Sequence, residues 1–265
     1  MNQAKVLNFF GLLLIMFGVS FSVPLFVAVL YEESLVTVFG LGMSILVGLG
    51  FLSWFFTKNN KQELSLSDGF VITVLFWIVL SVSGSIPFIL FGFSVVDSFF
   101  ESMSGITTTG ATVVTGLDDL PRSLLIYRQL LQWLGGMGLI VLAIAVMPLL
   151  GIGGGQLFKT QTPGPMSEQR LTPRITSTAR ALWSIYLVLT VLCIFAYRFA
   201  GMSYFDAVSH AFSTVSIGGF STHDLSIGYF DSVSVEVVCV IFMLLSAMSF
   251  VVHYSAIYRK QVLKY

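Results

Sequence analysis

Residues 97–110 read DSFFESMSGITTTG, and residues 206–219, 109 positions later, read DAVSHAFSTVSIGG. The two stretches share their first aspartate, a serine at Ser104 and Ser213, and their last glycine. A long apolar stretch precedes each copy and another follows it. The repeated unit is therefore a long apolar span, a short apolar run, a polar stretch rich in Gly, Thr and Ser, and a second span. Such self-similarity at a fixed offset indicates a duplicated structural unit.

The short apolar run of each copy predicts a helix that is too short to cross a membrane. Asp97 and Asp206 are expected to cap the N-termini, and Glu101 suits the positive end of the helix dipole. About ten helical residues rise about 15 Å, roughly half the thickness of the hydrocarbon core. Irregular backbone at that depth persists only where it is buried in protein or lines a watery cavity. We therefore expect a re-entrant loop whose polar stretch lines a cavity.

The composition places these units in a membrane. Of 265 residues, 56% are hydrophobic and only 10% are charged, and the formal net charge is zero. A soluble domain carries about 25% charged residues, and no basic excess is present that would bind nucleic acid. Long charge-free runs lie between residues 5 and 32, 33 and 58, 68 and 97, 128 and 159, and 236 and 259, with a shorter one between 180 and 198. These runs predict six membrane-spanning helices in an all-α integral membrane protein within the lipid bilayer.

The order of the spans predicts four parts. Residues 1–62 form an N-terminal two-helix hairpin without a loop copy, and residues 63–158 form the first pore repeat. Residues 159–177 are expected to form a cytoplasmic linker, and residues 178–265 the second pore repeat.

The distribution of basic residues predicts the orientation, because cytoplasmic loops are enriched in Lys and Arg. With six spans, ten basic residues lie on the side of both termini, and only Arg122, Arg128 and Arg198 lie on the other side. Both termini are therefore expected to be cytoplasmic.

Two polar segments carry the candidate chemistry. The first polar segment is residues 107–112 (TTTGAT), and the second polar segment is residues 216–221 (SIGGFS). Cation filters replace the hydration shell with backbone carbonyls, and glycine allows the backbone conformations that direct successive carbonyls at one axis. The helix ahead of each segment also directs its negative C-terminal end toward the cavity. An ordinary extracellular loop is the alternative for either segment alone, but two copies after matching short helices favour a filter.

Three motifs resemble TrkH-type potassium uptake subunits: residues 99–112 (FFESMSGITTTGAT), 127–138 (YRQLLQWLGGMG) and 217–224 (IGGFSTHD). The resemblance implies a pore-forming subunit of a bacterial inner membrane, regulated by a cytoplasmic TrkA-type nucleotide-binding partner. It also implies that potassium, the transported ligand, is bound by backbone carbonyls and that the chain holds no cofactor. By match of motif, these carbonyls belong to Thr108, Thr109, Gly110, Ile217, Gly218 and Gly219.

The family builds its pore from four such repeats, whereas two are present up to Tyr265. We expect the sequence to be the N-terminal half of a longer protein. Pairing of two chains is the alternative, and a homodimer is expected.

Three other classes of function are alternatives to a pore. A secondary transporter of another solute uses broken helices at mid-membrane, and a non-conducting structural subunit is also compatible with half a pore. An intramembrane enzyme is disfavoured. No two neighbouring spans supply a Ser/His pair, and the sequence has no His-Glu-x-x-His signature.

The remaining histidines and cysteines carry weaker signals. His210, His223 and His253 are expected to lie far apart, which argues against a metal cluster. Cys193 and Cys239 fall inside predicted spans, where free buried thiols are expected.

Arg128, at the outer start of a span, is expected to pair with a carboxylate or with loop carbonyls. Within the same span, Gly135, Gly136 and Gly138 are expected to allow close helix packing. A group of outer acids either concentrates cations at the mouth or forms a solvated loop surface. These acids are Asp118, Asp119, Asp224 and Asp231.

Overall fold

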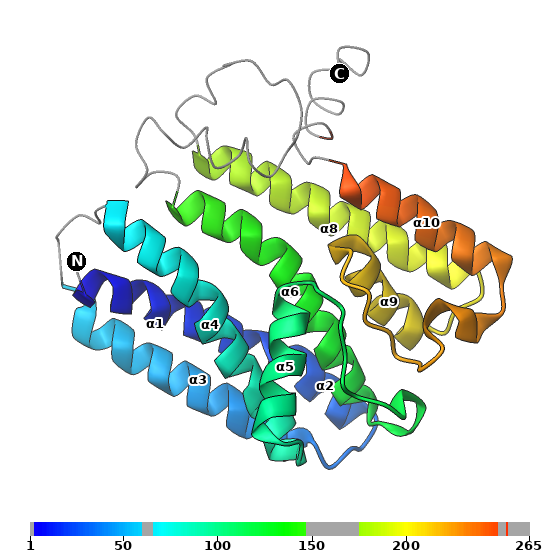
Figure 1. Ribbon diagram of the computed structural model, residues 1–265, viewed down its shortest axis with the longest axis horizontal. Helices are drawn as coiled ribbons and strands as arrows, with labels where there is room; N and C mark the ends of the chain where they lie inside the picture. Colours follow the sequence, from blue (N-terminus) through cyan, green and yellow to red (C-terminus); the bar gives the residue numbers. More distant parts are fainter. Residues whose placement is uncertain (1–2, 60–65, 147–174, 249–252, 254–265) are drawn as a thin grey trace.

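The computed structural model describes residues 3–59, 66–146, 175–248 and 253, and the elements in these ranges are all helical (Figure 1). In chain order they are α1 (Gln3–Ser20), α2 (Ser22–Leu30), α3 (Val36–Thr57), α4 (Leu66–Phe91), α5 (Val95–Ile106), the 3-10 helix η1 (Leu117–Asp119), α6 (Arg122–Val146), α8 (Ile175–Phe199), α9 (Tyr204–Ser216), the 3-10 helix η3 (Ser226–Phe230) and α10 (Val233–Ala247). The expected all-α fold is confirmed.

Four of the helical stretches are long and apolar enough to cross a membrane: 3–30, 36–57, 67–91 and 182–199. The other two predicted spans coincide with α6 and with α10. The described part of α10 runs over Val233–Ala247, which is shorter than the predicted span. The first predicted span coincides with the stretch 3–30, which a turn at Phe21 divides into α1 and α2. Pro24 explains the break, because it has no N–H to donate to the carbonyl four residues earlier.

The offset of 109 residues holds for every element of the repeat. Shifted by that offset, α4 coincides with α8, α5 with α9, η1 with the start of η3, and α6 with α10, with ends that differ by a few residues. The backbone repeats as well, since Gly92 (φ 118°) and Gly201 (φ 110°) both turn the chain between the long and the short helix. The two copies therefore fold alike.

The predicted part boundaries fall largely outside the described residues. α8 begins at Ile175, three residues before the expected start of the second repeat at 178. Residues 60–65, around the end of the hairpin, and 147–174, including most of the predicted linker, lie outside the described ranges.

The hairpin packs through glycines and joins the first repeat through an acid. A Cβ added to Gly50 would lie 2.7 Å from the carbonyl oxygen of Gly11, so α1 and α3 approach at backbone distance. In the loop after α2, the Glu33 carboxylate accepts hydrogen bonds from the backbone N–H groups of Arg122 (2.7 Å) and Ser123 (3.0 Å). Because a carboxylate favours a helix N-terminus, Glu33 caps α6 and fixes its N-terminal end.

Aromatic packing around Tyr127 holds α6 near its N-terminal end. The ring of Tyr127 lies 5.2 Å from Phe21, 5.4 Å from Phe39 and 5.2 Å from Phe88, measured between centroids. Its hydroxyl donates to the carbonyl oxygen of Gly84 at 2.7 Å. α6 is therefore fixed against α2, α3 and α4, and its other side is left for the two short helices.

Candidate functional site

The two short helices begin in the same way. Ser94 caps α5 and Ser203 caps α9, and each hydroxyl oxygen accepts a hydrogen bond from the backbone N–H three residues later, at 3.1 Å. The expectation that Asp97 and Asp206 are the caps was wrong by three residues. Each aspartate instead accepts a hydrogen bond from the serine hydroxyl, at 2.7 Å in α5 and 2.6 Å in α9.

The two short helices also end in the same way, in a Schellman motif. In α5 the N–H of Thr109 donates to Ser104 O (2.9 Å), and in α9 the N–H of Gly218 donates to Ser213 O (2.8 Å). The residue before each donor is left-handed, Thr108 with φ 54° and Ile217 with φ 55°. β-branched residues rarely adopt this conformation, and such strain gathers at functional sites.

The first and second polar segments meet at their glycines. Gly110 has φ 77° and Gly219 has φ 85°, which only glycine adopts without strain. A Cβ added to Gly110 would lie 2.2 Å from the carbonyl oxygen of Gly218, whereas one added to Gly219 would meet nothing closer than 3.9 Å. Gly110 is therefore required for both its conformation and its contact with the other segment.

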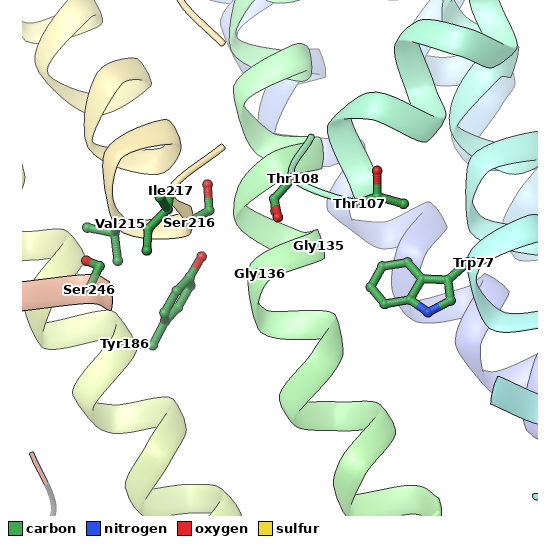
Figure 2. Close-up of a pocket in the computed structure, with 10 residues that line it drawn as sticks. All are labelled: Trp77, Thr107, Thr108, Gly135, Gly136, Tyr186, Val215, Ser216, Ile217 and Ser246. Atoms are coloured by element: carbon green, nitrogen blue, oxygen red, sulfur yellow. The ribbon is translucent and has the colours of Figure 1, made fainter. Parts of the chain in front are cut away.

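A cavity of about 290 Å³ lies at the C-terminal ends of both short helices (Figure 2). Thr107 and Thr108 line it from the first repeat, and Ser216 and Ile217 line it from the second. Gly135 of α6 lies between them, and a Cβ there would come within 1.9 Å of the carbonyl oxygen of Ile106. The close packing expected of this glycine is confirmed, and it brings α6 directly against the end of α5.

The six carbonyl groups predicted to bind the ion do not share one environment. Within the described part of the chain, the carbonyl oxygens of five of them accept no hydrogen bond: Thr108, Thr109, Gly110, Ile217 and Gly219. The sixth, Gly218 O, accepts a hydrogen bond from Gln132 Nε2 at 2.6 Å. Five carbonyls therefore remain available to a ligand, and one is held by a side chain.

A buried ion pair supports the first polar segment. Arg128 and Glu101 are both fully buried, and their closest nitrogen and oxygen atoms are 2.7 Å apart. The Thr112 hydroxyl donates to both Glu101 oxygens at 2.9 Å, and Arg128 donates to Thr112 Oγ1 (3.0 Å) and to Ser221 O (3.1 Å). The predicted structural role of Arg128 is confirmed, with Glu101 as its partner. Glu101 therefore serves this pair as well as the helix dipole.

The second repeat has a neutral version of this arrangement. His210 stands at the position of Glu101, and its Nε2 lies 2.9 Å from Ser221 Oγ, the counterpart of the Thr112 hydroxyl. Val237 stands at the position of Arg128. The expected separation of the histidines was wrong for one pair, since the rings of His210 and His223 lie 6.3 Å apart. No group of side chains suited to a metal occurs among the described residues.

Hydrogen bonds join the loops that follow the two polar segments. The carboxylate of Asp224 accepts from the N–H groups of Gly116 (3.1 Å) and Leu117 (3.0 Å). His223 Nδ1 lies 2.5 Å from Asp118 Oδ1, and this hydrogen bond lowers the pKa of Asp118, outweighing the opposing effect of burial. Two of the four outer acids therefore connect loops across the repeats.

Sequence reasoning gave no role to Gln132, although it is fully buried and contacts the second polar segment. A signal was present, because Gln132 is a polar residue within a predicted span and lies one helical turn after Arg128, on the same face of α6. Cys193 and Cys239 are both free thiols; Cys193 is buried as expected, whereas Cys239 is half-buried.

Comparisons with known proteins agree with this architecture. The sequence profile of the TrkH family, described as a cation transport protein, matches residues 36–264. The Trk system potassium uptake protein TrkH of Halomonas elongata is 50% identical, over 100% of this chain and 56% of that protein. The protein of the same name from Escherichia coli K12 is 46% identical, over 96% of this chain and 53% of that protein.

A solved structure shares the fold. The crystal structure of the potassium transporter TrkH from Vibrio parahaemolyticus matches with a TM-score of 0.85 and 47% identity, over 98% of this chain and 53% of that one. The chain thus spans about half the length of the curated relatives it matches. From the profile match and these identities, the chain belongs to the TrkH family of cation transport proteins.

Proposed function

We propose that this chain forms part of a potassium uptake pore in a bacterial inner membrane. α5 and α9 enter from the outer face and stop midway, and the two polar segments replace the water around the ion with backbone carbonyls. The ion then moves through the cavity below them. One observation carries this proposal: two helices that end in the same way place the left-handed residues Thr108 and Ile217 on one cavity, and the carbonyl oxygens of both accept no hydrogen bond from the described residues.

The charges around the cavity favour a cation. The C-termini of α5 and α9 both adjoin it, and each carries about half a negative charge from the helix dipole. The residues that line the cavity include no Lys, Arg, Asp or Glu within the described ranges. Selection is therefore assigned to backbone carbonyls and hydroxyl groups, which favours a filter over a transporter site built from charged side chains.

Names of the relatives support the substrate, since the Halomonas and Escherichia proteins are both called potassium uptake proteins. We further propose a TrkA-type nucleotide-binding subunit on the cytoplasmic side and a homodimeric assembly. Co-purification with such a subunit tests the first, and the mass of the purified complex in detergent tests the second.

Ion flux in liposomes tests the function. The intact transporter, reconstituted in liposomes loaded with potassium, is expected to take up tracer Rb⁺ along the gradient. Added K⁺ should compete with this uptake much more strongly than added Na⁺ does. Equal competition by the two ions, or no flux from well-folded protein, would contradict the proposal.

The proposed topology makes a separate prediction. Single cysteines at Asp119 and Gln169 should differ in intact cells, with a membrane-impermeant thiol reagent labelling the first and sparing the second until the cells are opened. Asp119 is exposed and lies in a loop that the proposed topology assigns to the outer side, whereas Gln169, outside the described residues, belongs to the predicted cytoplasmic linker. Labelling at Gln169 in intact cells would overturn the orientation of both termini.

A further inference from the structure

We propose that Gln132 is a positioning residue for ion selectivity, whose buried amide holds residues 218–220 in the conformation that the second polar segment needs. The proposal rests on the proposed function, because it names the side chain that holds one of the two polar segments in place.

The amide of Gln132 contacts this segment on both sides of Gly219. Nε2 donates to Gly218 O at 2.6 Å, and Oε1 accepts from the N–H of Phe220 at 3.1 Å. The side chain is fully buried, so water does not compete for either bond. One planar group therefore fixes the orientation of two peptide groups, and with them that of the glycine between them.

The amide of Gln132 packs so closely against Gly218 that no side chain fits there. A Cβ on Gly218 would lie 2.3 Å from Gln132 Cδ, 2.4 Å from Oε1 and 2.7 Å from Nε2. Gly218 itself does not have a positive φ, unlike its neighbours Ile217 and Gly219. Its lack of a side chain is explained by the approach of Gln132, which points to a specific contact between them.

The segment needs an external support because its backbone is strained. Ile217 holds φ 55° and Gly219 holds φ 85° on either side of Gly218. Strained conformations persist only where the surroundings over-determine them. The hydrogen bond from the N–H of Gly218 to Ser213 O fixes one side of Gly218. Gln132 holds the carbonyl oxygen of Gly218 and the N–H of Phe220.

The second repeat cannot supply this support from its own following helix. The positions of α10 that correspond to Arg128 and Gln132 are Val237 and Ile241, which are apolar and about half exposed. α6 takes over, because Arg128 also donates to Ser221 O at 3.1 Å. The first polar segment differs, since Glu101 of its own repeat binds Thr112 and Val113. Gln132 is thus specific to the second polar segment.

The test replaces Gln132 by a side chain of similar length that forms neither bond. We expect Gln132→Met in the intact transporter to lower the preference for K⁺ over Na⁺, measured by competition with Rb⁺ uptake in liposomes, by about tenfold. The matched control is Gln129→Met. Gln129 is equally buried on the same helix, and its amide has no hydrogen-bond partner among the described residues. The Gln129→Met transporter should therefore keep the wild-type preference for K⁺ over Na⁺.

The outcomes separate this inference from the proposed function, with Gly110→Ala measured in the same assay. A wild-type preference in Gln132→Met, beside an altered one in Gly110→Ala, overturns the role of Gln132 and leaves the pore intact. A wild-type preference in both overturns the pore as well. An equal loss in Gln129→Met and Gln132→Met shows a general effect of changing α6 and also overturns the role. If Gln132→Met does not fold, Gln132→Glu carries the test: it keeps an acceptor for the Phe220 N–H but replaces the donor to Gly218 O by a carboxylate oxygen, so the preference for K⁺ should fall, and a wild-type preference overturns the role.

Discussion

Gly110→Ala is expected to lower potassium uptake by the intact transporter about a hundredfold, with insertion into the membrane unchanged. The new Cβ would lie 2.2 Å from the carbonyl oxygen of Gly218, and the residue would have to keep φ 77°. Strain at such a position costs about 1–3 kcal/mol before the clash is counted, and 1.4 kcal/mol corresponds to a factor of ten. Because Gly218 belongs to the other repeat, both polar segments should shift. Uptake of Rb⁺ and its competition by Na⁺ measure the effect.

Gly219→Ala provides the matched comparison. Its φ of 85° is equally unsuited to alanine, but the nearest atom to an added Cβ lies 3.9 Å away. Only the backbone strain remains, so we expect a loss of about tenfold, smaller than that of Gly110→Ala. Wild-type uptake and ion preference in both variants would show that these glycines lie outside the ion pathway.

Removal of the Arg128 guanidinium should produce the largest loss of stability. Arg128→Met leaves the Glu101 carboxylate fully buried without its partner, which costs about 3–5 kcal/mol. The purified protein in detergent should unfold at a clearly lower temperature, as followed by intrinsic fluorescence. Arg198→Met is the control, because Arg198 is an exposed arginine over the Tyr204 ring and its removal should change stability by less than about 0.5 kcal/mol.

The second repeat suggests a double variant that should restore the stability lost in Arg128→Met. The double variant Glu101→His with Arg128→Val copies the residues found at the equivalent positions, His210 and Val237. It removes both charges together, so it should recover much of the stability lost in Arg128→Met. If Arg128→Met alone were as stable as the wild type, the buried pair would not be stabilising in the way its geometry suggests.

The sequence predicted the repeated unit well, because its signals are local. Apolar run lengths gave the two short helices, and the position of Gly110 and Gly219 marked the turns that the structure places at positive φ. The caps were missed by three residues because serine and aspartate are both good caps, and propensity does not distinguish Ser94 from Asp97. The turn at Phe21, inside the first span, was not predicted because hydropathy does not register the N–H that Pro24 lacks.

Contacts between distant residues could not be predicted. Glu101 and Arg128 lie 27 residues apart, and the amide of Gln132 binds a carbonyl 86 residues later. Neither spacing has a helical period, so only the packing of α6 between α5 and α9 brings these groups together. His210 and His223 were placed apart for the same reason, since the second polar segment returns the chain toward the helix it left.

The buried pair also has a consequence for biosynthesis. Arginine is costly to place in a bilayer without a partner, and a nascent chain emerges from its N-terminus. Glu101 and Thr112 both precede Arg128, so the charge can be neutralised as soon as α6 is made, before any residue of the second repeat has left the ribosome. The first repeat can therefore fold in the membrane before the second repeat is made, and the second repeat then packs against it.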